Sequence, residues 1–198
     1  MSSILGHSLA GMSVWALARR CPALRPLEQK GWLAAAAAGG CLPDLDSLLG
    51  LPHRGPTHTL GFALAAAGVL AAVVAASGRR REALWIWPTF TLIVWLHPMM
   101  DLLNGGGPDV ALFAPFWSRA FSPVAGGLPL HGYTSDWGGL FGLLFNPRTF
   151  MGMMIEAAIF GPLFAATVVQ RRPLDIVLGL AGASVWILLA TFSGPIRP

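Results

Sequence analysis

The sequence predicts an all-α membrane protein: a polytopic bundle of about six spans that forms a single domain over residues 1–198. Hydrophobic residues make up 55% of the chain and charged residues only 11%, and the mean hydropathy is +0.63. Soluble domains average about 25% charged residues. The apolar residues also lie in long runs that end at basic residues or at segments rich in Gly and Pro, as expected of membrane-spanning helices.

The first two apolar segments are short for a span, which needs about 20 residues. Residues 4–18 end at a pair of arginines, and residues 31–42 are rich in alanine and could continue as helix to about Leu49. A basic connection with two prolines, residues 21–30, lies between them. We expect both helices to be short or tilted.

The later segments are more typical of spans. Residues 59–77 and 83–103 are separated by an arginine triplet, and residues 150–169 and 174–192 are separated by an arginine pair. Between these two pairs lies a Gly- and Pro-rich segment, residues 105–148, which we expect to cover one end of the bundle. Six spans result, and five remain possible because the first two are short.

The basic residues orient this bundle by the positive-inside rule. With an outer N-terminus, nine of the thirteen lysines and arginines fall in inner loops and four outside. The nine are Arg19, Arg20, Arg25, Lys30, Arg79, Arg80, Arg81, Arg171 and Arg172, and the four are Arg54, Arg119, Arg148 and Arg197. Helix orientation thus accounts for the net charge of +4, and we expect no nucleic-acid partner.

Polar residues interrupt the apolar background mainly between the second and third segments. Pro43-Asp44-Leu45-Asp46 is followed by His53-Arg54-Gly55-Pro56-Thr57-His58. Polar groups placed in a bilayer are costly and usually functional. In the predicted orientation this stretch lies in one outer layer with the other unusual polar residues of the spans, which are His7, His97, Asp101 and Glu156.

The residue types in this layer predict a metal site. His97 and Asp101 are four residues apart and therefore share one helix face. Imidazole and carboxylate ligands together suit zinc or a related divalent ion. Several such groups in a low-dielectric place require cations, and two or three ions satisfy that demand better than one. Of Asp44 and Asp46, one is expected to bind metal and the other to bridge or orient.

These motifs also carry a family resemblance. Gly6-His7, Pro43-Asp44-Leu45-Asp46, the His53–His58 stretch and His97-Pro-Met-Met-Asp101 resemble, in order, the motif series of the YdjM family over residues 6–104. The resemblance implies a metal-dependent hydrolase of the bacterial inner membrane. More distantly, the motif order is similar to that of zinc-dependent phospholipase C and P1-type nucleases, helical enzymes that use three zinc ions on phosphoesters.

The resemblance also implies a set of ligands. A second clear HxxxE pair is missing, and Glu156 and His131 are the candidates for its place. The positions that the resemblance makes ligands are His7, Asp44, His58, His97 and Asp101; the residue types add Asp46 and Glu156 as further candidates.

Structural roles are the alternative at each position. His97 and Asp101 could form a hydrogen-bonded pair, and the two aspartates before Leu49 could cap a helix end. Arg54 could anchor the chain at the interface, and Thr57 could cap the third span. Glu156 is more simply explained by pairing with an arginine than by metal ligation.

Two functions fit these residues. The first is a hydrolase that cleaves a phosphoester or related ester of a lipid or lipid-linked substrate with a metal-activated water, with Asp46 or His53 as base and Arg54 holding the substrate anion. The second is a metal-binding transporter or scaffold. Transit sites continue to both faces, whereas the inner halves of these spans are Ala, Leu and Val, so the sequence favours the enzyme. The oligomeric state stays open.

Overall fold

The computed structural model describes residues 4–27, 30–103 and 108–123, and seven helical residues further on. Those seven are Met154, Glu156, Ala157, Phe160, Gly161, Phe164 and Ala165. The described part is helical, apart from connections and one isolated bridge between Val110 and Phe121. The predicted all-α class is therefore confirmed for these residues. The predicted span at 174–192 lies outside them, as does His131.

The first two helices form an antiparallel pair. Helix α1 (Ile4–Ala18) has the predicted bounds, and α2 (Lys30–Cys41) begins and ends one residue before the predicted segment. A 3-10 turn, η1 (Pro22–Leu27), lies between them. The two helices approach so closely that a Cβ on Gly11 or Gly40 would collide with the backbone of the facing helix. Small residues allow such an approach in membrane helix pairs.

Helix α2 does not continue to Leu49 as an uninterrupted helix. It gives way to a 3-10 turn, η2 (Leu42–Asp44), and then to the single turn α3 (Leu45–Leu48). Pro43 explains the break, because its ring cannot donate a backbone hydrogen bond and collides with the preceding helical turn.

The second pair consists of α4 (Leu60–Ala76) and α5 (Arg80–Leu103), so α5 begins three residues before the predicted segment. Another 3-10 turn, η3 (Pro56–His58), precedes α4. The cap of α4 is Thr59, whose hydroxyl accepts a hydrogen bond from the amide of Phe62 at 3.1 Å. The alternative that Thr57 caps this helix is therefore wrong.

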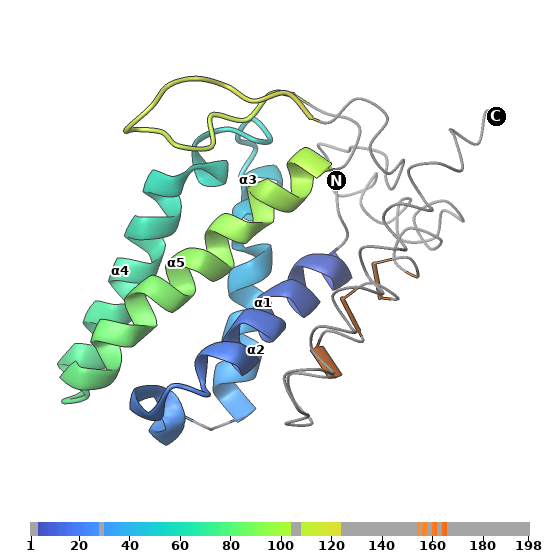
Figure 1. Ribbon diagram of the computed structural model, residues 1–198. Helices are drawn as coiled ribbons and strands as arrows, with labels where there is room; N and C mark the ends of the chain where they lie inside the picture. The colour runs from blue at the N-terminus through green and yellow to red at the C-terminus, as the bar shows by residue number, and fades with distance from the viewer. Residues whose placement is uncertain are drawn as a thin grey trace.

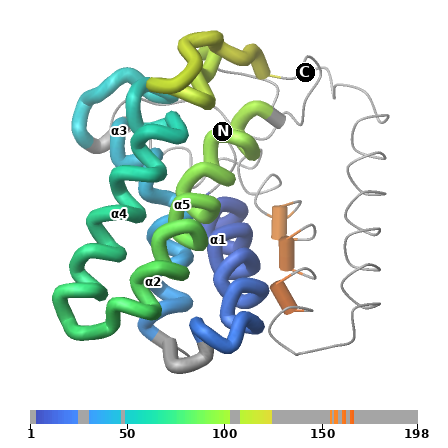
Figure 2. The backbone as a smooth tube through the Cα atoms, turned by 60° about the vertical axis from the view of Figure 1, so that its left-hand side comes forward, coloured from blue at the N-terminus to red at the C-terminus, as the bar shows by residue number. Residues whose placement is uncertain are grey.

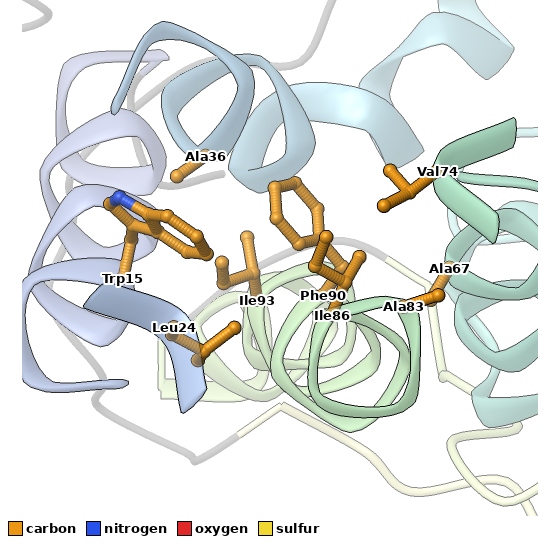
Figure 3. Packing of buried hydrophobic residues seen from close by; sticks show 9 residues of the cluster. All are labelled: Trp15, Leu24, Ala36, Ala67, Val74, Ala83, Ile86, Phe90 and Ile93. Carbon is orange, nitrogen blue, oxygen red and sulfur yellow. The ribbon is translucent and has the colours of Figure 1, made fainter. Parts of the chain in front are cut away.

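Helix α5 also packs against α1 and α2, so it joins the two pairs into one bundle (Figures 1 and 2). The apolar core lies where the three helices meet and includes Trp15, Ile86, Phe90 and Ile93 (Figure 3). Trp15 stacks on Trp32 with ring centroids 5.5 Å apart. The arginines that follow α1 and α4 lie at the end of the bundle where these two helices end and α5 begins (Figure 1).

One described helix is long and apolar enough to cross a membrane by itself, namely residues Arg80–Leu102 of α5. Helices α1 and α4 are apolar but shorter, with 15 and 17 residues. Of the predicted fifth span, the described residues are the seven given above. The count of six spans therefore stays a prediction.

Residues 108–123 lie over the end of the bundle where α4 begins and α5 ends (yellow in Figure 1). The amides of Leu60 and Gly61 donate to the carbonyls of Leu112 and Ala114 at 2.9 and 2.8 Å. The indole of Trp95 in α5 donates to the carbonyl of Leu112 at 3.2 Å. For this part of the Gly- and Pro-rich segment, the expected position over one end of the bundle is confirmed.

Candidate metal centre

Seven of the predicted site residues meet at this same end of the bundle, although they come from distant parts of the chain. Six of them are buried, and the Asp44 side chain retains 16% of its exposure. Residues far apart in the sequence thus share one layer of the bundle, as the sequence predicts. The seven are His7 of α1, Asp44 and Asp46 after α2, His53 and His58 before α4, and His97 and Asp101 of α5.

Four potential ligand atoms lie close to one another, with each imidazole nitrogen near two carboxylate oxygens. His97 Nε2 lies 3.3 Å from Asp44 Oδ1 and 3.8 Å from Asp101 Oδ2. His58 Nε2 lies 4.0 Å from Asp44 Oδ1 and 3.6 Å from Asp101 Oδ2. Tetrahedral zinc with bonds of about 2.0–2.2 Å sets its ligand atoms about 3.3–3.6 Å apart. Two of the observed distances lie in this range, and the other two, 3.8 and 4.0 Å, are slightly longer.

The other ring nitrogen of three histidines is held from behind. His97 Nδ1 lies 2.7 Å from the carbonyl oxygen of Gly40. The Nδ1 atoms of His58 and His53 lie 3.2 and 3.3 Å from the two oxygens of Asp46. Metal-binding histidines are usually oriented in this way by a carbonyl or carboxylate. The arrangement aims their Nε2 atoms at Asp44 and Asp101.

The electrostatics of these contacts call for a cation. A carbonyl can only accept, so His97 Nδ1 carries the proton, and a neutral ring then presents its Nε2 lone pair to the Asp44 carboxylate. Within the described part of the chain, His97 Nε2, His58 Nε2 and Asp44 Oδ1 are buried without a hydrogen-bond partner. A positive ion between them would turn these repulsions into bonds.

The charge balance points the same way. With neutral imidazoles, the carboxylates of Asp44, Asp46 and Asp101 carry three negative charges against one positive charge on Arg54. These residues thus carry an excess of negative charge, which favours a bound cation because buried charges are stable only when they are compensated. Burial lowers the pKa of His58, but the neighbouring carboxylates of Asp101 and Asp46 raise it to about 9, so these carboxylates attract positive charge to this point. The donor set therefore fits a divalent metal with nitrogen and oxygen ligands.

Asp46 faces the back of the two imidazoles. Its Oδ2 also accepts a hydrogen bond of 3.1 Å from the hydroxyl of Thr57. Burial raises the pKa of Asp46, but hydrogen bonds with His53 and His58 lower it below its ordinary value, so the carboxylate stays ionised. These contacts favour an orienting role for Asp46 over the ligand or base role expected from the sequence.

Arg54 is also engaged differently from the sequence expectation. Its two terminal nitrogens donate to the carbonyls of Pro108 and Asp101, each at 3.0 Å, and its Nε lies 3.5 Å from Asp101 Oδ2. The residue has a φ of 60°, which costs a non-glycine residue about 1–2 kcal/mol. The guanidinium therefore holds the end of α5 in place, and these contacts give no support to a clamp on a substrate anion.

His7 and Glu156 extend the cluster toward the C-terminal part of the chain. The ring of His7 stacks on that of His97 with centroids 3.5 Å apart, and its Nε2 lies 3.5 Å from Asp101 Oδ1. Glu156 is buried, and a Cβ on Gly6 would lie 2.5 Å from its Oε2. The carboxylate of Glu156 thus occupies the space that a side chain at Gly6 would fill.

We expect Gly6→Ala to disturb the centre through this contact. The new methyl group would displace the Glu156 carboxylate, and such overpacking costs about 1–3 kcal/mol. Metal per protein and the thermal transition should both fall. Gly31→Ala is the matched control, because a Cβ there meets no atom within 4 Å. Equal metal content in both variants would separate Glu156 from the centre.

Sequence reasoning missed several partners of this cluster. Two are backbone carbonyls, of Gly40 and Pro108, which no pattern of side chains reveals. His53 was expected as a base, but it also forms a group of ligand-sized spacing with Asp44 and His58. The His53–His58 motif, with two imidazoles in six residues, was the signal that could have identified His53 as a candidate ligand.

A family model described as YdjM inner membrane protein matches residues 1–194. No curated protein and no solved structure matches the sequence. The family match covers the motifs at 6–104 and also most of the chain beyond them. The more distant resemblance to zinc-dependent phospholipase C stays a prediction.

Proposed function

The chain belongs to the YdjM family of inner membrane proteins, and from this premise we propose that it is a membrane-embedded, metal-dependent hydrolase. Its substrate would be a phosphoester or related ester of a membrane lipid or lipid-linked compound. One observation carries the proposal. The histidines at 53, 58 and 97 have their Nδ1 atoms held from behind, and their Nε2 atoms converge on two carboxylates.

We propose zinc as the metal and more than one ion. Three overlapping groups have ligand atoms within 4.8 Å of one another, which supports two or three neighbouring positions. A divalent ion there would lower the pKa of a bound water and so supply a nucleophile at neutral pH. The groups are His7 with Asp44 and His97, Asp44 with His53 and His58, and His58 with His97 and Asp101.

The protein's own residues suggest how the proton is handled. Asp46 accepts from Nδ1 of His53 at 3.3 Å, so the proton sits on that nitrogen and Nε2 is the basic one. An aspartate behind a histidine fixes the tautomer and stabilises the imidazolium that forms. In this proposal His53 Nε2 is not a metal ligand but accepts the proton of the attacking water, with Asp46 acting through it, and the metal positions are the two groups that contain His97.

A transporter or metal scaffold is the alternative. A transit path would need polar groups that continue through the bundle. Among the described residues, the buried polar side chain that lies outside the cluster and its neighbours Arg54, Thr57 and Glu156 is Ser13. Ser13 donates to the carbonyl of Leu9 in its own helix, so it offers no path. This apolar interior favours the hydrolase.

The test of the function is a turnover screen. Purified, zinc-loaded protein should release product from at least one member of a panel of phospholipid and polyprenyl phosphoesters. Asp44→Asn should reduce that turnover at least about 100-fold, the scale that loss of a key catalytic interaction reaches. Glu82→Gln, a carboxylate change at the other end of the bundle, should not. Metal-loaded protein that turns over no member of the panel would favour the scaffold.

We further propose that the centre faces the non-cytoplasmic side, because the arginine runs lie at the opposite end of the bundle. Single cysteines at Ser77 and Ser118, both exposed, test this in a background with Cys21 and Cys41 replaced by alanine. A membrane-impermeant maleimide applied from the periplasmic side should label position 118 and spare position 77. The reverse pattern would place the centre toward the cytoplasm.

A further inference from the structure

Residues 110–121, here called the aromatic hairpin, form a small self-packed unit. Val110 and Phe121 exchange two backbone hydrogen bonds of 2.9 and 2.8 Å. Phe113 packs against Phe121 and Trp117, with ring centroids 5.7 and 5.9 Å apart. The tip is ordered by backbone hydrogen bonds from Phe116 and Trp117 to Phe113. The hairpin therefore has a defined shape of its own.

The tip of this hairpin exposes large apolar side chains. Phe116 retains 73% and Trp117 50% of its exposure. Arg119 is exposed as well, and its guanidinium carbon lies 5.9 Å from the centre of the Trp117 ring. Arg119 is the hairpin's one charged residue. An exposed aromatic patch beside a cation marks an interaction surface rather than an ordinary loop.

The position of the hairpin suggests what covers this surface. It is fixed to the first turn of α4 and to Trp95, two turns before the end of α5. Helix α5 has 24 residues and is therefore about 36 Å long, slightly more than the hydrocarbon core of a bilayer at about 30 Å. Its end, and the hairpin with it, then lie at the level of the lipid headgroups.

We propose that the aromatic hairpin lies in the headgroup layer of the membrane and binds the phosphate of an anionic phospholipid through Arg119. Trp117 and Phe116 would reach toward the acyl boundary beside it. Tryptophan and arginine are the residues that anchor proteins at this level, and a cationic side chain gains affinity there from anionic lipids. The proposal rests on the membrane location of the family and not on hydrolysis.

The hairpin also connects the membrane surface with the metal centre. Pro108, two residues before it, accepts the hydrogen bond from Arg54, and Arg54 also holds the carbonyl of Asp101. Arg119 and the supporting Pro108 thus belong to one segment, residues 108–123, that lies over the end of the bundle. The hairpin is attached to α5, the helix long enough to cross the membrane, and this attachment favours a lipid over a partner protein on the same surface.

The experiment uses the full chain in nanodiscs, with a fluorophore on a cysteine at Ser118 in the background that lacks Cys21 and Cys41. Lipids brominated near the headgroup end of their acyl chains should quench the probe, and iodide in the buffer should quench it weakly. The same two quenchers are applied to a probe at Leu49, which is 70% exposed in the turn after α3. Its quenching provides the comparison for the probe at position 118. A thermal transition equal to that of the native chain shows that the background is folded.

Lipid selectivity completes the test. In nanodiscs of mixed phosphatidylglycerol and phosphatidylcholine, the native chain should retain phosphatidylglycerol on extraction in detergent, and Arg119→Gln should reduce that retention about fivefold, the effect of about one cation near an anionic surface. Strong iodide quenching without quenching by brominated lipid would place the hairpin in water and overturn the proposal. Protection from both quenchers would indicate a protein partner and overturn it equally.

Discussion

His97→Ala is expected to remove most of the bound metal while leaving the helices folded. The change deletes a nitrogen that lies 3.3 Å from Asp44 Oδ1 and 3.8 Å from Asp101 Oδ2. Outer groups that merely orient a ligand contribute about 10–100-fold to metal affinity, so loss of a ligand should cost more than about 100-fold. Metal per protein, measured by mass spectrometry after dialysis, and a competition titration provide the measurement.

Two further variants grade this result. Asp46→Asn removes the charged acceptor behind His53 and His58 but leaves the Nε2 atoms of both histidines in place. Metal affinity should therefore fall by about 10–100-fold. Glu82→Gln removes a carboxylate that pairs with Arg79 at the other end of the bundle, and metal affinity should not change. Native metal content in His97→Ala would contradict the metal centre. A loss in Asp46→Asn as large as that in His97→Ala would make Asp46 a ligand.

Arg54→Lys is expected to lower both stability and metal content. A lysine keeps the charge, but its single nitrogen cannot donate to the carbonyls of Pro108 and Asp101 in the same fork geometry. Leaving one buried carbonyl without its donor costs about 1–3 kcal/mol, which lowers the thermal transition by several degrees in a chain of this size. Because Asp101 belongs to the cluster, metal content should fall with it.

The control for Arg54→Lys is Arg79→Lys, at a partly exposed ion pair with Glu82 where either cation serves about equally well. Arg54 as a clamp on a substrate anion predicts the opposite pattern. In that case metal content and thermal transition would match those of the native chain, and turnover alone would fall. Such a result would contradict the positioning role that the contacts assign to Arg54.

The sequence alone was sufficient for the helical class and for most helix bounds of the first half. Long apolar runs between basic residues predict helices strongly, and α1 and α4 agree with their predicted segments to within a residue. The error at Leu49 has a local cause, because Pro43 stops the helix that the alanine-rich run suggested. The residues that cluster in the structure were also singled out in the sequence, since ionisable groups are rare in such runs.

Only the tertiary structure decided which groups each of these residues contacts. A carboxylate in a motif can bind a metal, accept a proton or orient a histidine, and its neighbours in space determine which. Asp46 faces the Nδ1 atoms of His53 and His58, and Arg54 donates to backbone carbonyls that are 54 and 47 residues away. The sequence specified the charged groups because burying them is costly. Their roles depend on distances of 3–4 Å between segments that meet only when the bundle packs.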